Sequence, residues 1–144
     1  MRKFIYLVIL LGICGTSCTS HKEIQKATSF KIGNSVCQKW IGGRESSGSG
    51  LDILFSTTLS EASTIVLKEV FFRNKQVPAG LFYEAGVYYI RAEIPSTAAN
   101  SKEAINFELK ASEAIVSFTE NNVLKYIKVV GIKEKEPLIY NSRP

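Results

Sequence analysis

The sequence predicts an all-β protein, an antiparallel β-sandwich of immunoglobulin-like type, from two observations. Apolar and polar residues alternate with a period of two in several segments, which is the pattern of half-buried strands. Short runs rich in Gly, Pro and Asn separate these segments, and no segment shows a convincing amphipathic helix. Seven or eight short strands fit a sandwich. A small β-barrel is the alternative, because periodicity alone does not distinguish the two.

The first half of the domain contains three predicted strands. In residues 51–55, apolar side chains alternate with Asp52, and residues 64–72 are rich in β-branched and aromatic residues. Residues 87–94 place four apolar side chains on one face and two charged ones on the other: Tyr88, Ile90, Ala92 and Ile94 against Arg91 and Glu93. Each of these segments is expected to bury one face.

The second half continues the same pattern. Residues 104–111 (AINFELKA) place Ile105, Phe107 and Leu109 on one face, which predicts a further strand. Residues 114–118 predict the next strand. The Asn121-Asn122 pair can adopt positive φ and suits a tight hairpin, so that residues 123–132 would form the returning strand.

The N-terminus has the three-part build of a secretory signal peptide. Arg2 and Lys3 precede ten almost unbroken apolar residues, 4–13, which small residues and Cys18 follow. As a helix, ten residues extend only about 15 Å, half the hydrocarbon core of a bilayer. We therefore expect residues 1–17 to be a cleaved signal peptide and not a permanent transmembrane span.

The run Gly15-Thr16-Ser17-Cys18 resembles the lipobox of bacterial lipoproteins. The resemblance implies that Cys18 becomes a lipidated N-terminus anchored in a membrane. Residues 18–32 would then form the lipidated N-terminus and a flexible polar tether, and residues 33–144 the sandwich. The alternative is ordinary signal-peptidase cleavage, which would give a soluble periplasmic or secreted domain in which Cys18 and Cys37 could form a disulfide.

The residue inventory argues against most catalytic and metal sites. His21, the single histidine, lies in the tether, so no Ser–His or Cys–His pair and no usual zinc site can form in the folded part. The glutamates are scattered, and their spacing nominates no catalytic pair. We expect no catalytic residue, metal or cofactor. An enzyme that uses carboxylates or Cys37 as a nucleophile remains the competing hypothesis, although burial of this lone thiol is favoured.

Charge excludes one partner class. Loss of Arg2 and Lys3 would lower the net charge from +5 to +3, and no basic stripe with interleaved aromatic residues is present. We therefore expect no nucleic-acid binding.

Residues 43–50 are rich in glycine and serine but do not form a phosphate-binding loop. Ser49 stands where the loop lysine should be, and a strand follows where a helix is required. Trp40 is expected to anchor the core or an edge, while the glycines let the chain turn sharply. The functional alternative is a binding loop in which Trp40 and Arg44 offer an aromatic face and a set of donors.

The layout of the chain looks like that of small uncharacterised lipoproteins of Gram-negative bacteria. The residues that carry this resemblance are Cys18, Trp40, Gly42, Gly43, Gly48 and Gly50. It implies an envelope location and a β-rich domain, without a known activity. In such lipoproteins an Asp after the lipidated cysteine can signal inner-membrane retention, and Thr19 at this position favours the outer membrane.

The function we expect is a membrane-tethered, non-catalytic binding or structural module. Its partners would be the membrane, through lipid on Cys18, and a protein, peptide or glycan. A soluble inhibitor or accessory that adds a strand to its partner is a further hypothesis, and an exposed unpaired edge strand would distinguish it.

Overall fold

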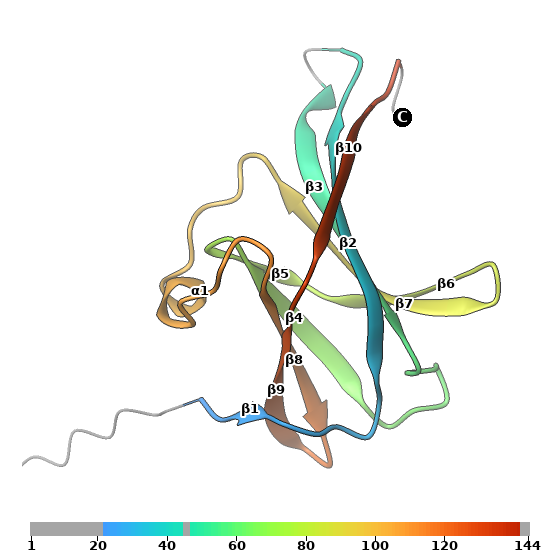
Figure 1. Ribbon diagram of the computed structural model, residues 1–144, viewed down its shortest axis with the longest axis vertical. Helices are drawn as coiled ribbons and strands as arrows, with labels where there is room; N and C mark the ends of the chain where they lie inside the picture. The colour runs from blue at the N-terminus through green and yellow to red at the C-terminus, as the bar shows by residue number, and fades with distance from the viewer. Residues whose placement is uncertain (1–21, 45–46, 142–144) are drawn as a thin grey trace, which may run out of the picture.

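The computed structural model describes residues 22–44 and 47–141, which form two five-stranded sheets packed against each other (Figure 1). The predicted all-β sandwich is confirmed, and these sheets do not close into a barrel. The immunoglobulin-like subtype stays a prediction. Cys18 and the predicted signal peptide lie outside the described residues.

The first sheet has the strand order β1-β9-β8-β4-β5. Its strands are β1 (Ile24–Gln25), β9 (Val123–Val129), β8 (Ala114–Glu120), β4 (Val66–Phe72) and β5 (Lys75–Pro78).

The second sheet has the order β10-β2-β3-β7-β6. Its strands are β10 (Lys133–Ile139), β2 (Ile32–Ile41), β3 (Ser49–Thr57), β7 (Val87–Pro95) and β6 (Gly80–Glu84). Neighbours are antiparallel except β1 with β9 and β10 with β2, which are parallel. Both sheets are therefore mixed, because strands from the two ends of the described chain add at their edges.

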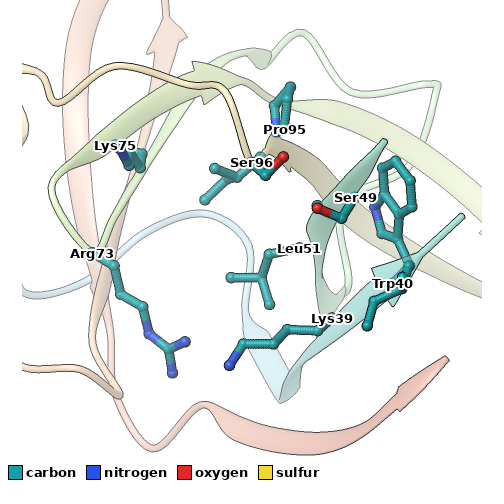
Figure 2. Close-up of a pocket in the computed structure, with 11 residues that line it drawn as sticks. Lys39, Trp40, Ser49, Leu51, Arg73, Lys75, Pro95 and Ser96 are labelled. Atoms are coloured by element: carbon teal, nitrogen blue, oxygen red, sulfur yellow. The ribbon is translucent and has the colours of Figure 1, made fainter. Parts of the chain in front are cut away.

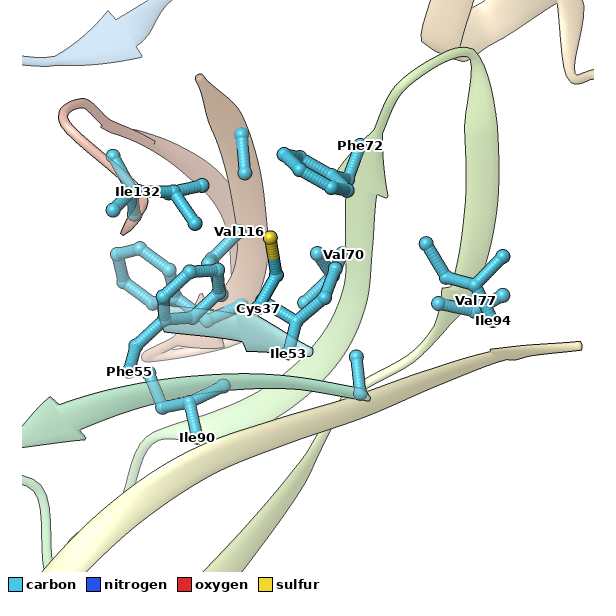
Figure 3. Packing of buried hydrophobic residues seen from close by; sticks show 14 of the residues in the cluster. Cys37, Ile53, Phe55, Val70, Phe72, Val77, Ile90, Ile94, Val116 and Ile132 are labelled. Atoms are coloured by element: carbon cyan, nitrogen blue, oxygen red, sulfur yellow. The ribbon is translucent and has the colours of Figure 1, made fainter. Parts of the chain in front are cut away.

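The core fills the space between the sheets with the alternating residues that the sequence marked. Ile53 and Phe55 of β3 and Ile90 of β7 are fully buried, and they face Val70 and Phe72 of β4 across the interior (Figure 3). Removing such a side chain from water stabilises the fold by about 1.5–3 kcal/mol. The predicted Asn121-Asn122 hairpin is also confirmed, since the two residues have φ values of 51° and 62° between β8 and β9.

The prediction of a strand over residues 104–111 is wrong. A short helix, α1 (Lys102–Asn106), lies there, and Glu108 leaves it with a φ of 51°. The Oγ atom of Ser101 accepts a hydrogen bond from the backbone N–H of Ala104 and so caps the helix. Five residues are too few to show a period of 3.6, so the accidental alternation in this segment was misleading.

The helix covers a second, smaller cluster on the outer face of the first sheet. Ala104 packs there with Phe71, Ile115 and Tyr126, and Phe107 joins the cluster from the turn after α1. Ile105, which the strand pattern would have buried, is 48% exposed.

The described part of the predicted tether packs on the sandwich. Within residues 22–32, β1 pairs with β9, and the buried Phe30 ring meets Phe118 edge-on, with centroids 5.1 Å apart. The Lys22 ammonium forms a salt bridge with Glu103, and it lies 5.3–5.8 Å from the ring centroids of Phe71, Phe107 and Tyr126. The described residues of the predicted tether therefore make specific contacts with the sandwich.

Candidate functional site

An apolar cleft opens at the end of the sandwich where β2 passes into β3. Its volume is about 410 Å³, and its apolar lining includes Trp40, Leu51, Ile94 and Pro95 (Figure 2). Leu51 and Ile94 are direct neighbours on β3 and β7. They extend the rows of core residues formed by Ile53 and Ala92, so the cleft is a continuation of the interior that is open to solvent.

The first sheet supplies the opposite wall of the cleft. Its strands β4 and β5 meet in a tight turn at Arg73 and Asn74, whose φ values are 46° and 63°. Arg73 and Lys75 line the cleft from this turn and from β5. Core side chains of this sheet reach as far as Phe72 in β4, and charged ones take their place beyond it.

Three cations surround the apolar floor: Lys39, Arg73 and Lys75. Behind them, Glu134 of β10 pairs with two of these cations, at 2.8 Å from Arg73 Nη2 and 3.4 Å from Lys39 Nζ. The third, Lys75 Nζ, donates a hydrogen bond to the backbone oxygen of Ala98 at 2.5 Å. Three positive charges against one carboxylate leave the rim of the cleft cationic at neutral pH.

Glu134 is held in its charged form. The hydrogen bond from Arg73, together with the charges of Arg73 and Lys39, keeps the pKa of Glu134 below its ordinary value. The carboxylate therefore screens the two cations at neutral pH and releases them only in acid.

The structure separates the two residues of the predicted binding loop. Trp40 lies in β2, where it is 8% exposed and packs over Gly50 of β3. Arg44 is exposed in the turn that follows and is not among the residues that line the cleft. Trp40 is therefore a lining residue of the cleft whose indole packs against Gly50, whereas Arg44 lies outside the cleft.

The sequence pattern did not predict the cationic rim, although it contains one signal for it. Lys39 is two residues from Cys37, which is 1% exposed, so the period of two places both side chains on the inner face of β2. A lysine in an inward-facing row at the end of a strand indicates that the interior opens to solvent there. No comparable signal in the sequence brings Arg73 and Lys75 to the same place.

Other candidate chemistry finds little support in the described residues. Burial raises the pKa of the Cys37 thiol, and this free cysteine lies within the core (Figure 3). A thiol in that state is a poor nucleophile. Within residues 22–44 and 47–141, no three His, Cys, Asp or Glu side chains gather as a metal site would require.

Comparisons with known proteins assign the chain to no family. No protein-family model, curated protein or solved structure matches the chain. Across the part of the chain that the structure describes, no helix has the length and apolar character needed to span a membrane.

Proposed function

We propose that the protein is an envelope lipoprotein, tethered to the outer membrane through lipid on Cys18, that binds amphipathic anions without catalysing a reaction. The ligand class we infer has an apolar chain or ring system and one anionic group, such as a fatty-acid carboxylate or a lipid phosphate. The observation that carries this proposal is the apolar cleft with its cationic rim.

The two parts of the cleft suit the two parts of such a ligand. Each methylene group that the floor of Leu51, Ile94 and Pro95 removes from water contributes up to about 0.8 kcal/mol. At the rim, the ammonium of Lys39 and the guanidinium of Arg73 can donate hydrogen bonds to an anionic head group.

The position of the cleft is compatible with a tether. The cleft lies at the β2–β3 end of the sandwich, whereas β1, which follows the first described residues, lies towards the other end (Figure 1). A chain that is anchored ahead of β1 therefore leaves the cleft accessible.

The test is a titration with octanesulfonate below its micelle-forming concentration, followed by the fluorescence of Trp40. This is the only tryptophan of the chain and it lines the cleft. We expect saturable binding that tightens roughly two- to fourfold for each added methylene in a series of alkyl sulfonates. Lys39→Ala should weaken binding about three- to fivefold, since a partly exposed charge pair contributes up to about 1 kcal/mol.

Lys102→Ala is the matched control, because it removes one exposed lysine of α1 outside the cleft. It should leave the affinity unchanged. Equal weakening by both variants would show only a general effect of net charge, and an unchanged Trp40 signal at all concentrations would reject the proposed site. Octyl glucoside, which has the chain without the anion, should bind less tightly than octanesulfonate.

The anchor is tested separately by mass spectrometry of the mature protein from its native membrane fraction. We expect an N-terminal peptide that starts at Cys18 and carries acyl mass. An unmodified N-terminus at Cys18, or a Cys18–Cys37 disulfide, would contradict the lipoprotein assignment and leave the titration of the cleft unaffected.

A further inference from the structure

The sheet edges in the described part of the chain differ in how well they are protected against pairing with another chain. Strand β10 (KEKEPLI) carries four charged residues and Pro137, β5 is four residues long and ends at Pro78, and β1 has two residues. Charges, proline and short length are the usual devices that prevent edge-to-edge association. Strand β6 (GLFYE) has no proline and no lysine, and it is an edge strand of the second sheet.

Strand β6 is also unusually apolar for an exposed edge. Its hairpin with β7 projects from the sandwich (Figure 1), and Phe82 and Tyr83 are 38% and 56% exposed. The two aromatic side chains point to opposite faces of the sheet, because they are adjacent in a strand. An edge of this composition is expected to associate with another strand.

We propose that β6 pairs with β6 of a second copy of this chain, antiparallel and centred on Phe82, so that the two second sheets become one continuous sheet. In this register Phe82 faces the partner's Phe82, Leu81 faces the partner's Tyr83, and Gly80 faces the partner's Glu84. A twofold axis perpendicular to the sheet relates the two copies, which gives a closed dimer.

Charge and shape complementarity favour β6 of a second copy as the strand that pairs with this edge. Gly80 lies beside Arg91 of β7, and the space where a side chain of Gly80 would begin has no neighbouring atom within 4 Å. The partner's Glu84 would lie across this gap, on the face that carries Arg91. The Arg91 side chain is 38% exposed, and the contacts of its guanidinium with Asp52 and Glu93 are long, at 3.5 and 3.9 Å, so it has donors left for a third carboxylate.

The aromatic residues fit the same register. Phe82 lies beside Tyr89 of β7, and the Arg91 guanidinium lies 5.7 Å from the centre of the Phe82 ring. On the opposite face, Tyr83 and Tyr88 pack with centroids 4.6 Å apart. Pairing would cover Phe82 with the partner's Phe82, and Tyr83 with the partner's Leu81, and cross-strand pairs of this kind stabilise antiparallel sheets.

The register is tested with the Phe82→Cys variant of the full mature chain. The variant is oxidised in its native membrane and then analysed by gel electrophoresis without reductant. Residues that face each other across an antiparallel pair have Cα atoms about 4.5–5.5 Å apart, within the range of a disulfide. We expect a covalent dimer of this chain. Tyr83→Cys is the matched control: it exposes a thiol on the same strand, but two such residues would lie about 8 Å apart, too far to be bridged.

Equal cross-linking of both variants would indicate random collision and overturn the proposal. So would a Phe82→Cys chain that stays monomeric, or one that cross-links to a different protein.

Sedimentation of the detergent-solubilised mature chain gives a second measurement that needs no oxidation. Glu84→Arg, which opposes the partner's Arg91, should weaken self-association about tenfold, while Glu61→Arg in an exposed turn should not. A wild-type chain that sediments as a monomer throughout would also contradict the dimer.

Discussion

Gly50→Ala is expected to lower the free energy of unfolding by about 1–3 kcal/mol, the usual cost of overpacking. A methyl group at Gly50 would lie 2.8 Å from the backbone oxygen of Ile94 and 2.8 Å from Nε1 of Trp40. Neither neighbour moves easily, because one is backbone in the adjacent strand β7 and the other is a large indole that is 8% exposed. The glycine therefore permits the close packing of Trp40 on β3.

Gly80→Ala is the matched control for this measurement. The methyl group would meet no atom within 4 Å, and Gly80 has no positive φ. The free energy of unfolding of the Gly80→Ala variant should therefore change little. Urea unfolding of both variants in dilute protein gives the comparison. A Gly50→Ala variant as stable as Gly80→Ala would mean that Trp40 does not depend on the missing side chain.

Glu134→Gln is expected to tighten the binding of octanesulfonate about three- to fivefold at pH 7. The carboxylate pairs with Arg73 and Lys39, so its removal frees two cations at the rim of the cleft. The change in affinity corresponds to the loss of a partly exposed ion pair, worth up to about 1 kcal/mol. Glu61→Gln, at an exposed turn, is the control and should leave the affinity unchanged.

The wild-type protein should show the same gain in acid. Because the pKa of Glu134 is lowered, the group stays charged below the ordinary glutamate value of about 4.3 and is protonated only at lower pH. Affinity should therefore rise as the pH falls through the lowered value, since the sulfonate stays ionised. In Glu134→Gln this rise should be absent, and a rise of equal size in the variant would assign it to another group.

The same group links pH to folding. A carboxylate whose folded pKa is depressed contributes stability above its unfolded pKa and loses it as the pH falls through the folded value. Binding in acid must therefore be measured where the protein is still folded, as shown by its circular dichroism.

Sequence periodicity predicted the rows of buried residues well, because burial of one face of a strand imposes a period of two. Ile53, Phe55, Ile90 and Ile94 are all buried as expected. It failed over residues 104–111, where the capping interaction of Ser101 and the packing of Ala104 from α1 against the first sheet outweigh a chance alternation. Position 101 carried a usable helix signal, a serine directly before Lys-Glu-Ala.

The cleft could not be predicted from the sequence, because it depends on how two sheets end relative to each other. Lys39 belongs to the second sheet, whereas Arg73 and Lys75 belong to a hairpin of the first. The edges are a different case: the charges and the proline of β10 and the apolar composition of β6 are visible in the sequence. Which strands form edges is known only from the topology.

The most direct test of the proposed function is an NMR titration of the ¹⁵N-labelled protein with octanesulfonate. We expect saturable shifts of the backbone amides of Lys39, Leu51 and Ser96, which line the cleft from three strands or their ends. The chemical shifts of the amides in the β6–β7 hairpin and in β1 should not change. Shifts confined to the exposed aromatic residues of that hairpin, or no saturable shifts at all, would contradict a binding site in the cleft.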